Sequence, residues 1–62
     1  MEKTTLSVKE VAQYIGVHQE TIYTLVHMKQ IPHFRCGRRI LFSKEMLEMW
    51  MEDQIRKNME KE

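Results

Sequence analysis

The chain has 62 residues, with ten Lys and Arg against nine Asp and Glu, and one cysteine. A chain of this length is expected to form a single domain over residues 1–62, with no room for a second, ligand-sensing domain. One cysteine excludes an internal disulfide, and its neighbours offer no ligand set for a closed zinc site. No run of about 18 apolar residues is present, and the N-terminal segment is polar where a secretory signal needs an apolar stretch. We therefore expect a cytoplasmic protein that makes no membrane contact.

Charge is divided unevenly along the chain. Residues 1–44 hold seven Lys and Arg against three acids, a net charge of +4, whereas residues 45–62 hold three bases against six acids, a net charge of −3. This asymmetry favours a protein whose first part faces phosphate and whose last segment faces away from it.

A first helix is predicted to begin after Ser7. Ser7 is a good N-cap, and Glu10 stands three residues later, which completes a capping box. Apolar residues recur at helical spacing from Val8 to Ile15 and form one buried stripe. Gly16 is predicted to end the helix, because glycine accepts the left-handed conformation at no steric cost.

A second helix follows at once, because only residues 16–18 separate the first helix from the next apolar period, Ile22, Leu25 and Val26. Such close succession is the spacing of a helix-turn-helix. Proline disfavours an α conformation in the residue before it, so Ile31-Pro32 is predicted to end this helix. With the apolar side chains turned inward, the candidate DNA-reading residues are His18, Gln19, Glu20, Thr21, Tyr23, Thr24 and His27.

Between residues 33 and 42 the apolar period changes to two around Gly37, which predicts a β-hairpin. A two-residue loop would pair Phe34 with Leu41 and set the two apolar faces against each other. A three-residue loop, 37–39, pairs Phe34 with Phe42 and aligns these faces, so we favour it. This register places Arg38 and Arg39 at the tip of the hairpin and Arg35 on its outer face.

Ser43 is a second N-cap, and the apolar residues Met46, Leu47, Trp50 and Met51 predict a third helix that packs onto the hairpin and the first two helices. Trp50 is predicted to be the largest contributor to the core. Beyond residue 53 only a thin apolar stripe remains, so residues 54–62 either fray or pair with a partner. The predicted fold is mainly α with a small β-hairpin, a winged helix-turn-helix in the order helix-helix-hairpin-helix, with its core at about residues 5–53.

The second helix carries side chains suited to the major groove of B-DNA, which admits a helix and exposes base edges to its N-terminal end. Gln19 can form a bidentate bond with adenine. Glu20 either accepts from cytosine N4 or stabilises the helix N-terminus, and these two readings stay open. Thr21 or Thr24 can contact phosphate or a thymine methyl group. Tyr23 more often packs beside the helix with its hydroxyl on a phosphate than reads a base.

The hairpin supplies the cations Arg35, Arg38 and Arg39. Arginine forks suit the minor groove or the phosphate backbone, although the same cluster by itself is also typical of an ordinary solvated hairpin tip. Three lysines are predicted to add phosphate contacts that carry no sequence information, namely Lys9, Lys29 and Lys44. The histidines are scattered and no catalytic set is implied by the spacing, so we expect no catalytic site, metal, cofactor or small-molecule ligand.

Several motifs together resemble the excisionase-type, MerR-like winged helix-turn-helix family over roughly residues 5–51. They are Leu6-Ser7-Val8-Lys9-Glu10-Val11-Ala12, Ile15-Gly16-Val17, Thr21-Ile22-Tyr23, Ile31-Pro32, Arg35-x-Gly37-Arg38-Arg39, Phe42-Ser43-x-Glu45-x-Leu47 and Trp50. The resemblance implies a winged domain whose second helix enters the major groove of double-stranded DNA and whose wing grips the flanking DNA. Members of this family include small transcription regulators and excisionases, which bend attachment-site DNA and recruit an integrase.

Three positions depart from the pattern of that family. His18 stands where Ser or Thr usually caps the second helix, Thr24 stands where Arg is common, and Lys29-Gln30 replaces a turn that usually contains glycine. We expect an excisionase associated with the nucleoid, with an integrase and a second copy on DNA as candidate partners. The alternatives are a small transcription regulator and a protein-interaction domain that uses its last helix.

Overall fold

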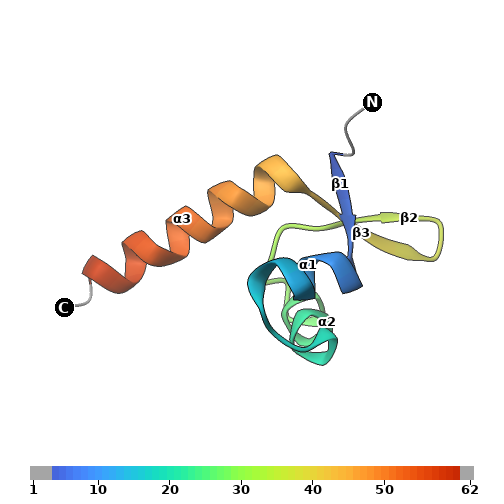
Figure 1. Cartoon of the computed structure of the whole chain (residues 1–62), viewed down its shortest axis with the longest axis horizontal. Coiled ribbons are helices and arrows are strands. Elements are labelled where there is room, and N and C mark those ends of the chain that lie inside the picture. The colour runs from blue at the N-terminus through green and yellow to red at the C-terminus, as the bar shows by residue number, and fades with distance from the viewer. Residues whose placement is uncertain (1–3, 61–62) are drawn as a thin grey trace.

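The computed structural model describes residues 4–60. Its elements in chain order are β1 (Thr5–Ser7), α1 (Val8–Ile15), α2 (Gln19–His27), β2 (Phe34–Cys36), β3 (Arg39–Ser43) and α3 (Lys44–Glu60). The β2–β3 hairpin and α3 extend in opposite directions from the pair α1 and α2 (Figure 1). Three helices with a small antiparallel sheet form a winged helix-turn-helix, in the predicted order helix-helix-hairpin-helix.

The strand β1, which was not predicted, completes a three-stranded sheet in the order β1-β3-β2. Leu6 of β1 lies opposite Phe42 of β3 in an antiparallel pair. The backbone N–H of Lys44 donates to the Thr4 carbonyl at 2.9 Å. Three residues are too few to show a β period in the sequence, and their pairing partner lies more than thirty positions away, at residues 41–43.

The caps of α1 are those predicted. The Glu10 N–H donates to Ser7 Oγ at 3.2 Å, and the Ser7 N–H donates to Glu10 Oε1 at 3.0 Å. Gly16 ends the helix in the left-handed conformation with φ of 90°. These hydrogen bonds join residues only a few positions apart in the sequence, which is why local sequence signals predict the ends of α1 correctly.

The end of α2 differs from the prediction, since the helix closes at His27 and not at Ile31-Pro32. The Lys29 N–H donates to the Val26 carbonyl at 3.0 Å, and the Gln30 N–H donates to the Leu25 carbonyl at 2.8 Å. This is a Schellman motif with Lys29, at φ of 57°, in the place that glycine usually occupies. The reversal frees Ile31 to enter the core, where it is buried.

The predicted register of the hairpin is wrong. Phe34 pairs with Leu41 and Cys36 pairs with Arg39, which leaves a two-residue loop. Gly37 opens that loop with φ of 62°, and a positive φ at this position is what a type II′ turn requires. The prediction failed because it placed Phe34 on the apolar face beside Phe42, whereas the side chain of Phe34 is 44% exposed.

This register also corrects the face assigned to Arg35. Arg35 lies opposite Ile40 and therefore shares a face with Ile40 and Phe42, not the outer face of the sheet. Arg38 lies in the turn as predicted, and Arg39 is the first residue of β3.

The core is built from both helices of the helix-turn-helix, the centre of the sheet and the start of α3. Phe42 is completely buried and is the largest of the fully buried side chains. Trp50 is only partly buried against this cluster, so its predicted role as the main core residue is wrong. The buried residues are Val8, Val11, Ala12, Ile22, Val26, Ile31, Phe42 and Leu47.

The helix α3 continues through residues 54–60 and projects away from α1 and α2 (Figure 1). Leu47 is buried and Met51 partly buried, whereas Met46 is exposed. Within residues 4–60 no helix combines the length and the apolar character needed to cross a membrane.

Candidate nucleic-acid interface

A groove lies where the start of α1, the first turns of α2 and the wing meet. It encloses a cavity of about 410 Å³. The residues that line it are Ser7, Val8, Lys9, Gln19, Tyr23, Arg38, Arg39 and Ile40. The fold thus brings together five residues predicted to contact DNA, although they lie in three separate stretches of sequence.

The groove is electropositive. Three of the residues that line it are cations, namely Lys9, Arg38 and Arg39. No residue in the described lining is a carboxylate. The N-terminal end of α2, which begins at Gln19, adds the partial positive charge of a helix dipole. A surface of this charge and shape attracts the phosphate backbone of nucleic acid.

The outer face of α2 is open to a ligand. Ile22 and Val26 are buried beneath it, and Tyr23 is 51% exposed beside the wing. The hydroxyl of Thr24 donates to the Glu20 carbonyl at 2.9 Å, so its proton is held by the helix backbone. The exposed positions are His18, Gln19, Glu20, Thr21, Tyr23, Thr24 and His27.

His18 is the N-cap residue of α2, but its imidazole makes no capping hydrogen bond. Serine or threonine at this position would accept from the first turn of the helix. The ring is exposed at the leading end of the helix and is therefore accessible to a ligand.

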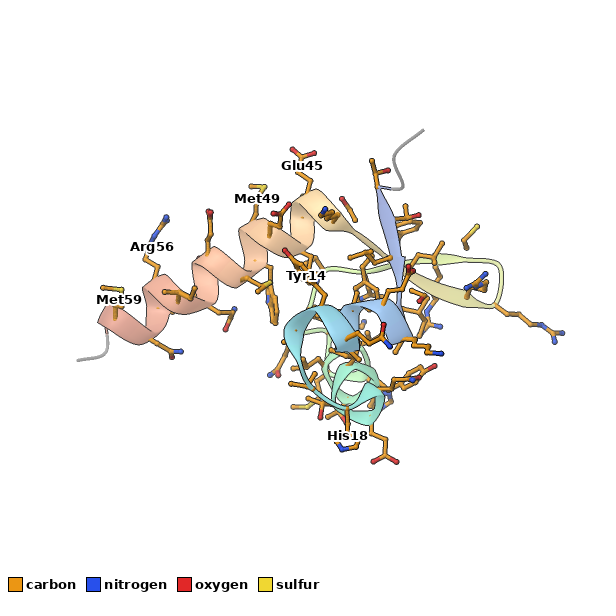
Figure 2. All side chains as sticks on the ribbon, viewed as in Figure 1. Tyr14, His18, Glu45, Met49, Arg56 and Met59 are labelled. Carbon is orange, nitrogen blue, oxygen red and sulfur yellow. The ribbon has the colours of Figure 1, made fainter. Side chains whose placement is uncertain are left out.

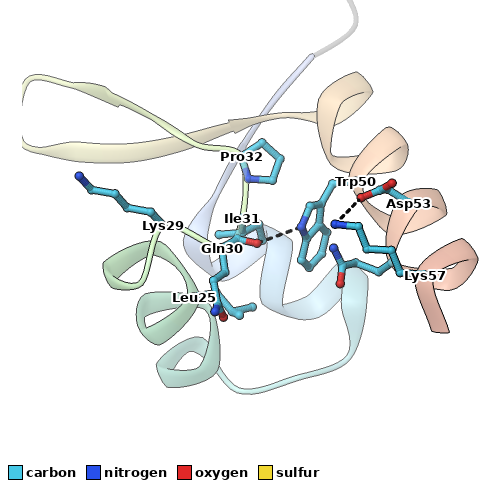
Figure 3. Close-up of a pocket in the computed structure, with 9 residues that line it drawn as sticks. Leu25, Lys29, Gln30, Ile31, Pro32, Trp50, Asp53 and Lys57 are labelled. Atoms are coloured by element: carbon cyan, nitrogen blue, oxygen red, sulfur yellow. Dashed lines mark hydrogen bonds and ion pairs between the residues drawn. The ribbon is translucent and has the colours of Figure 1, made fainter. Parts of the chain in front are cut away.

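Eight of the predicted residues do not line the groove. Four of them, His18, Glu20, Thr21 and Thr24, lie on the exposed side of α2 or at its N-cap, and the other four lie elsewhere. Arg35 is exposed on the edge strand β2, and His27 stands at the far end of α2, about 12 Å along the axis from Gln19. Lys44 begins α3, about 16 Å along β3 from Arg39. Lys29 lines a different cavity of about 630 Å³, whose lining also includes Trp50 and Lys57 (Figure 3).

Sequence reasoning missed three residues of the groove, Ser7, Val8 and Ile40. Val8 was predicted only as part of the buried stripe of the first helix. The pattern marked Ser7 as a helix cap and Ile40 as an apolar strand residue. Ile40 shares its strand face with the buried Phe42 and packs against the core, so it lines the groove beside α1 and α2. Within the described residues, 4–60, no three His, Cys, Asp or Glu side chains gather to hold a metal ion.

A helix-turn-helix whose second helix is exposed beside a basic β-wing defines a winged helix-turn-helix DNA-binding domain. The chain belongs to the helix-turn-helix domain family, whose model matches residues 5–55. Domains of this family bind DNA and are typically not enzymes. No curated protein and no solved structure matches the chain significantly.

Proposed function

We propose that this protein is an excisionase, a DNA-binding factor that binds and bends attachment-site DNA so that an integrase excises a mobile element. The observation that carries the proposal is the electropositive groove in which α2 meets the wing. The resemblance to excisionases over about residues 5–51 supports the choice within the helix-turn-helix family. The chain acts by binding, as one DNA-binding unit at the nucleoid, and not by catalysis.

In this proposal the N-terminal end of α2 enters the major groove. Gln19 lines the protein groove and forms the bidentate contact with adenine. Tyr23 places its hydroxyl on a phosphate, since it lies among the cations of the wing. The remaining exposed positions of α2 that face the bases or their flanking phosphates are His18, Glu20, Thr21, Thr24 and His27.

The wing grips the flanking DNA in this arrangement. Arg38 and Arg39 contact phosphates or the minor groove, and Arg35 extends the same cationic edge. Lys9 adds a phosphate contact within the groove. Lys29 and Lys44 lie outside the groove, and in this proposal they contact phosphates of DNA that bends toward them. Their position is therefore consistent with a protein that bends its site.

The test begins with selection of a binding site from random duplexes, followed by a salt titration on that site. A DNA-binding protein loses affinity with a log-log slope of about −0.9 for each phosphate contacted. A circular-permutation assay on the selected site then measures bending. Finally, the protein is expressed with the integrase of its own element, and excision of a reporter cassette is counted.

The outcomes separate three functions. Site-specific binding, bending and integrase-dependent excision together support the excisionase. Binding that alters transcription from a neighbouring promoter without excision would instead identify the protein as a small transcription regulator. If affinity for DNA does not depend on salt concentration, both DNA-binding functions are excluded. The remaining candidate is then a protein-interaction domain that uses α3. Cooperative binding at repeated sites would identify a second copy as a partner on DNA.

A further inference from the structure

The outer side of α3 carries a regular stripe of exposed side chains that DNA binding does not use. The stripe consists of Met49, Glu52, Arg56 and Met59, at successive spacings of three, four and three residues. These are the spacings of the contact positions in a coiled coil. Met49 is 57% exposed and Met59 is 73% exposed.

The stripe lies on the side of α3 turned away from the core, although Met49, Glu52 and Arg56 also line a surface cavity of about 510 Å³ whose lining includes Pro32 and Trp50. Leu47 is the buried residue of α3, and a rotation of about 100° per residue places the stripe on the opposite side of the helix from it. Figure 2 shows Met49, Arg56 and Met59 on the side of α3 turned away from α1 and α2. The ion pair of α3, Lys57 Nζ to Asp53 Oδ2 at 3.1 Å, lies off the stripe beside Trp50 (Figure 3).

We propose that two copies of this chain associate through antiparallel pairing of their α3 stripes. An antiparallel pair centred at residue 54 sets Met49 opposite the partner's Met59. The same register sets Glu52 opposite the partner's Arg56. Within residues 49–59 the four contact positions are therefore matched, methionine with methionine and carboxylate with guanidinium, twice about the two-fold axis.

The charges decide the direction of pairing. A parallel pair in register would set Glu52 against Glu52 and Arg56 against Arg56, and like charges in contact repel. The antiparallel pair turns both repulsions into attractions. Two methionines for each subunit form a narrower contact than permanent dimers use, so the association is reversible and depends on concentration.

The inference goes beyond DNA binding and does not depend on it, because the stripe shares no residue with the groove of α2 and the wing. A dimer of this kind leaves both grooves open. Two grooves related by a two-fold axis suit a pair of inverted half-sites.

Disulfide trapping without DNA tests the geometry. In a Cys36→Ser background, we expect Met49→Cys with Met59→Cys to form a covalent dimer under mild oxidation. The same two positions within one chain are about 15 Å apart along the helix, too far for an internal disulfide. Each single cysteine variant should remain monomeric, because its symmetry mate is about as distant. If the double variant forms no covalent dimer, or if either single variant forms as much covalent dimer as the double variant, the antiparallel register is wrong.

Sedimentation equilibrium tests the charges. The wild type should gain apparent mass with concentration, whereas Glu52→Arg alone and Arg56→Glu alone should stay monomeric. A mixture of these two variants should regain the dimer, and so should the double reversal in one chain. Lys57→Glu matches Arg56→Glu in charge but lies off the stripe, and it should dimerise like the wild type. A wild type that stays monomeric at every concentration, or charge reversals without effect, would refute the proposal whatever the DNA titration shows.

Discussion

The indole Nε1 of Trp50 donates a hydrogen bond of 2.9 Å to the carbonyl oxygen of Gln30. Gln30 is also the residue whose N–H closes the Schellman turn after α2. Trp50 therefore connects α3 to the point where the chain leaves the helix-turn-helix, across a surface cavity (Figure 3). The single tryptophan acts here as an oriented donor and not as the main filler of the core.

Removing only this hydrogen bond should have a moderate effect. Trp50→Phe keeps an aromatic ring but leaves the Gln30 carbonyl to water, and we expect a loss of about 1 kcal/mol in the free energy of unfolding. Urea denaturation followed by far-ultraviolet circular dichroism measures it. Phe34→Leu, an exposed aromatic change on β2, is the control and should cost less. An unchanged unfolding midpoint for Trp50→Phe would show that the bond contributes nothing.

Phe42 should matter more to stability than Trp50, because Phe42 is fully enclosed and Trp50 is not. Phe42→Ala is expected to cost about 3–5 kcal/mol, which in so small a domain removes most of the native population. Trp50→Ala should cost less and leave a folded protein. Thermal unfolding of both variants checks the order. A Trp50 variant less stable than the Phe42 variant would contradict the assignment of the core.

Lys29 occupies a left-handed position that glycine adopts without steric cost. Lys29→Gly should therefore stabilise the protein by about 0.5–1 kcal/mol, once the greater freedom of glycine in the unfolded chain is subtracted. Lys29→Ala removes the same charge but keeps the Cβ, so it should bring no comparable gain. Urea midpoints of the two variants give the difference, and equal midpoints would show that the turn carries no strain.

The wing arginines should act on all DNA sequences alike. Arg38→Ala with Arg39→Ala is expected to weaken binding to the selected site and to random duplex by the same factor. The log-log slope of affinity against salt concentration should fall by about 0.9 for each phosphate that the variant no longer neutralises. Arg38→Lys with Arg39→Lys keeps both charges and should keep most of the slope. Fluorescence anisotropy at several salt concentrations measures it. A weakening confined to the selected site would instead make these arginines readers of sequence.

Gln19 should affect discrimination and not general affinity. Gln19→Ala is expected to cost about 1–3 kcal/mol at the selected site and to relax preference at one base pair. Random duplex should bind almost as before. Gln13→Ala, a matched change at an exposed position on α1 outside the groove, should leave both affinities alone. Equal losses on selected and random DNA from Gln19→Ala would refute its role in reading.

Local signals predicted the helix-turn-helix well because its hydrogen bonds are local. The Ser7 cap, the partner Glu10 and the terminating Gly16 lie within one short segment, so the helix α1 could be read directly from residue types. The end of α2 could not be predicted from residue types in this way. Nothing in the residue type of Lys29 reports a left-handed backbone, and the signal of Pro32 lies beyond the true end of the helix.

The sequence by itself determined the order of helices and hairpin, the cap of α1 and the cations of the wing, since each depends on spacing or residue type over a few positions. The tertiary structure decided the pairing of β1 with β3, the two-residue turn at Gly37 and the partial exposure of Trp50. These features depend on which segments far apart in the chain share the space around Phe42. Alternation along one strand constrains side-chain faces, but only the strand beside it and the helices beneath it select the register.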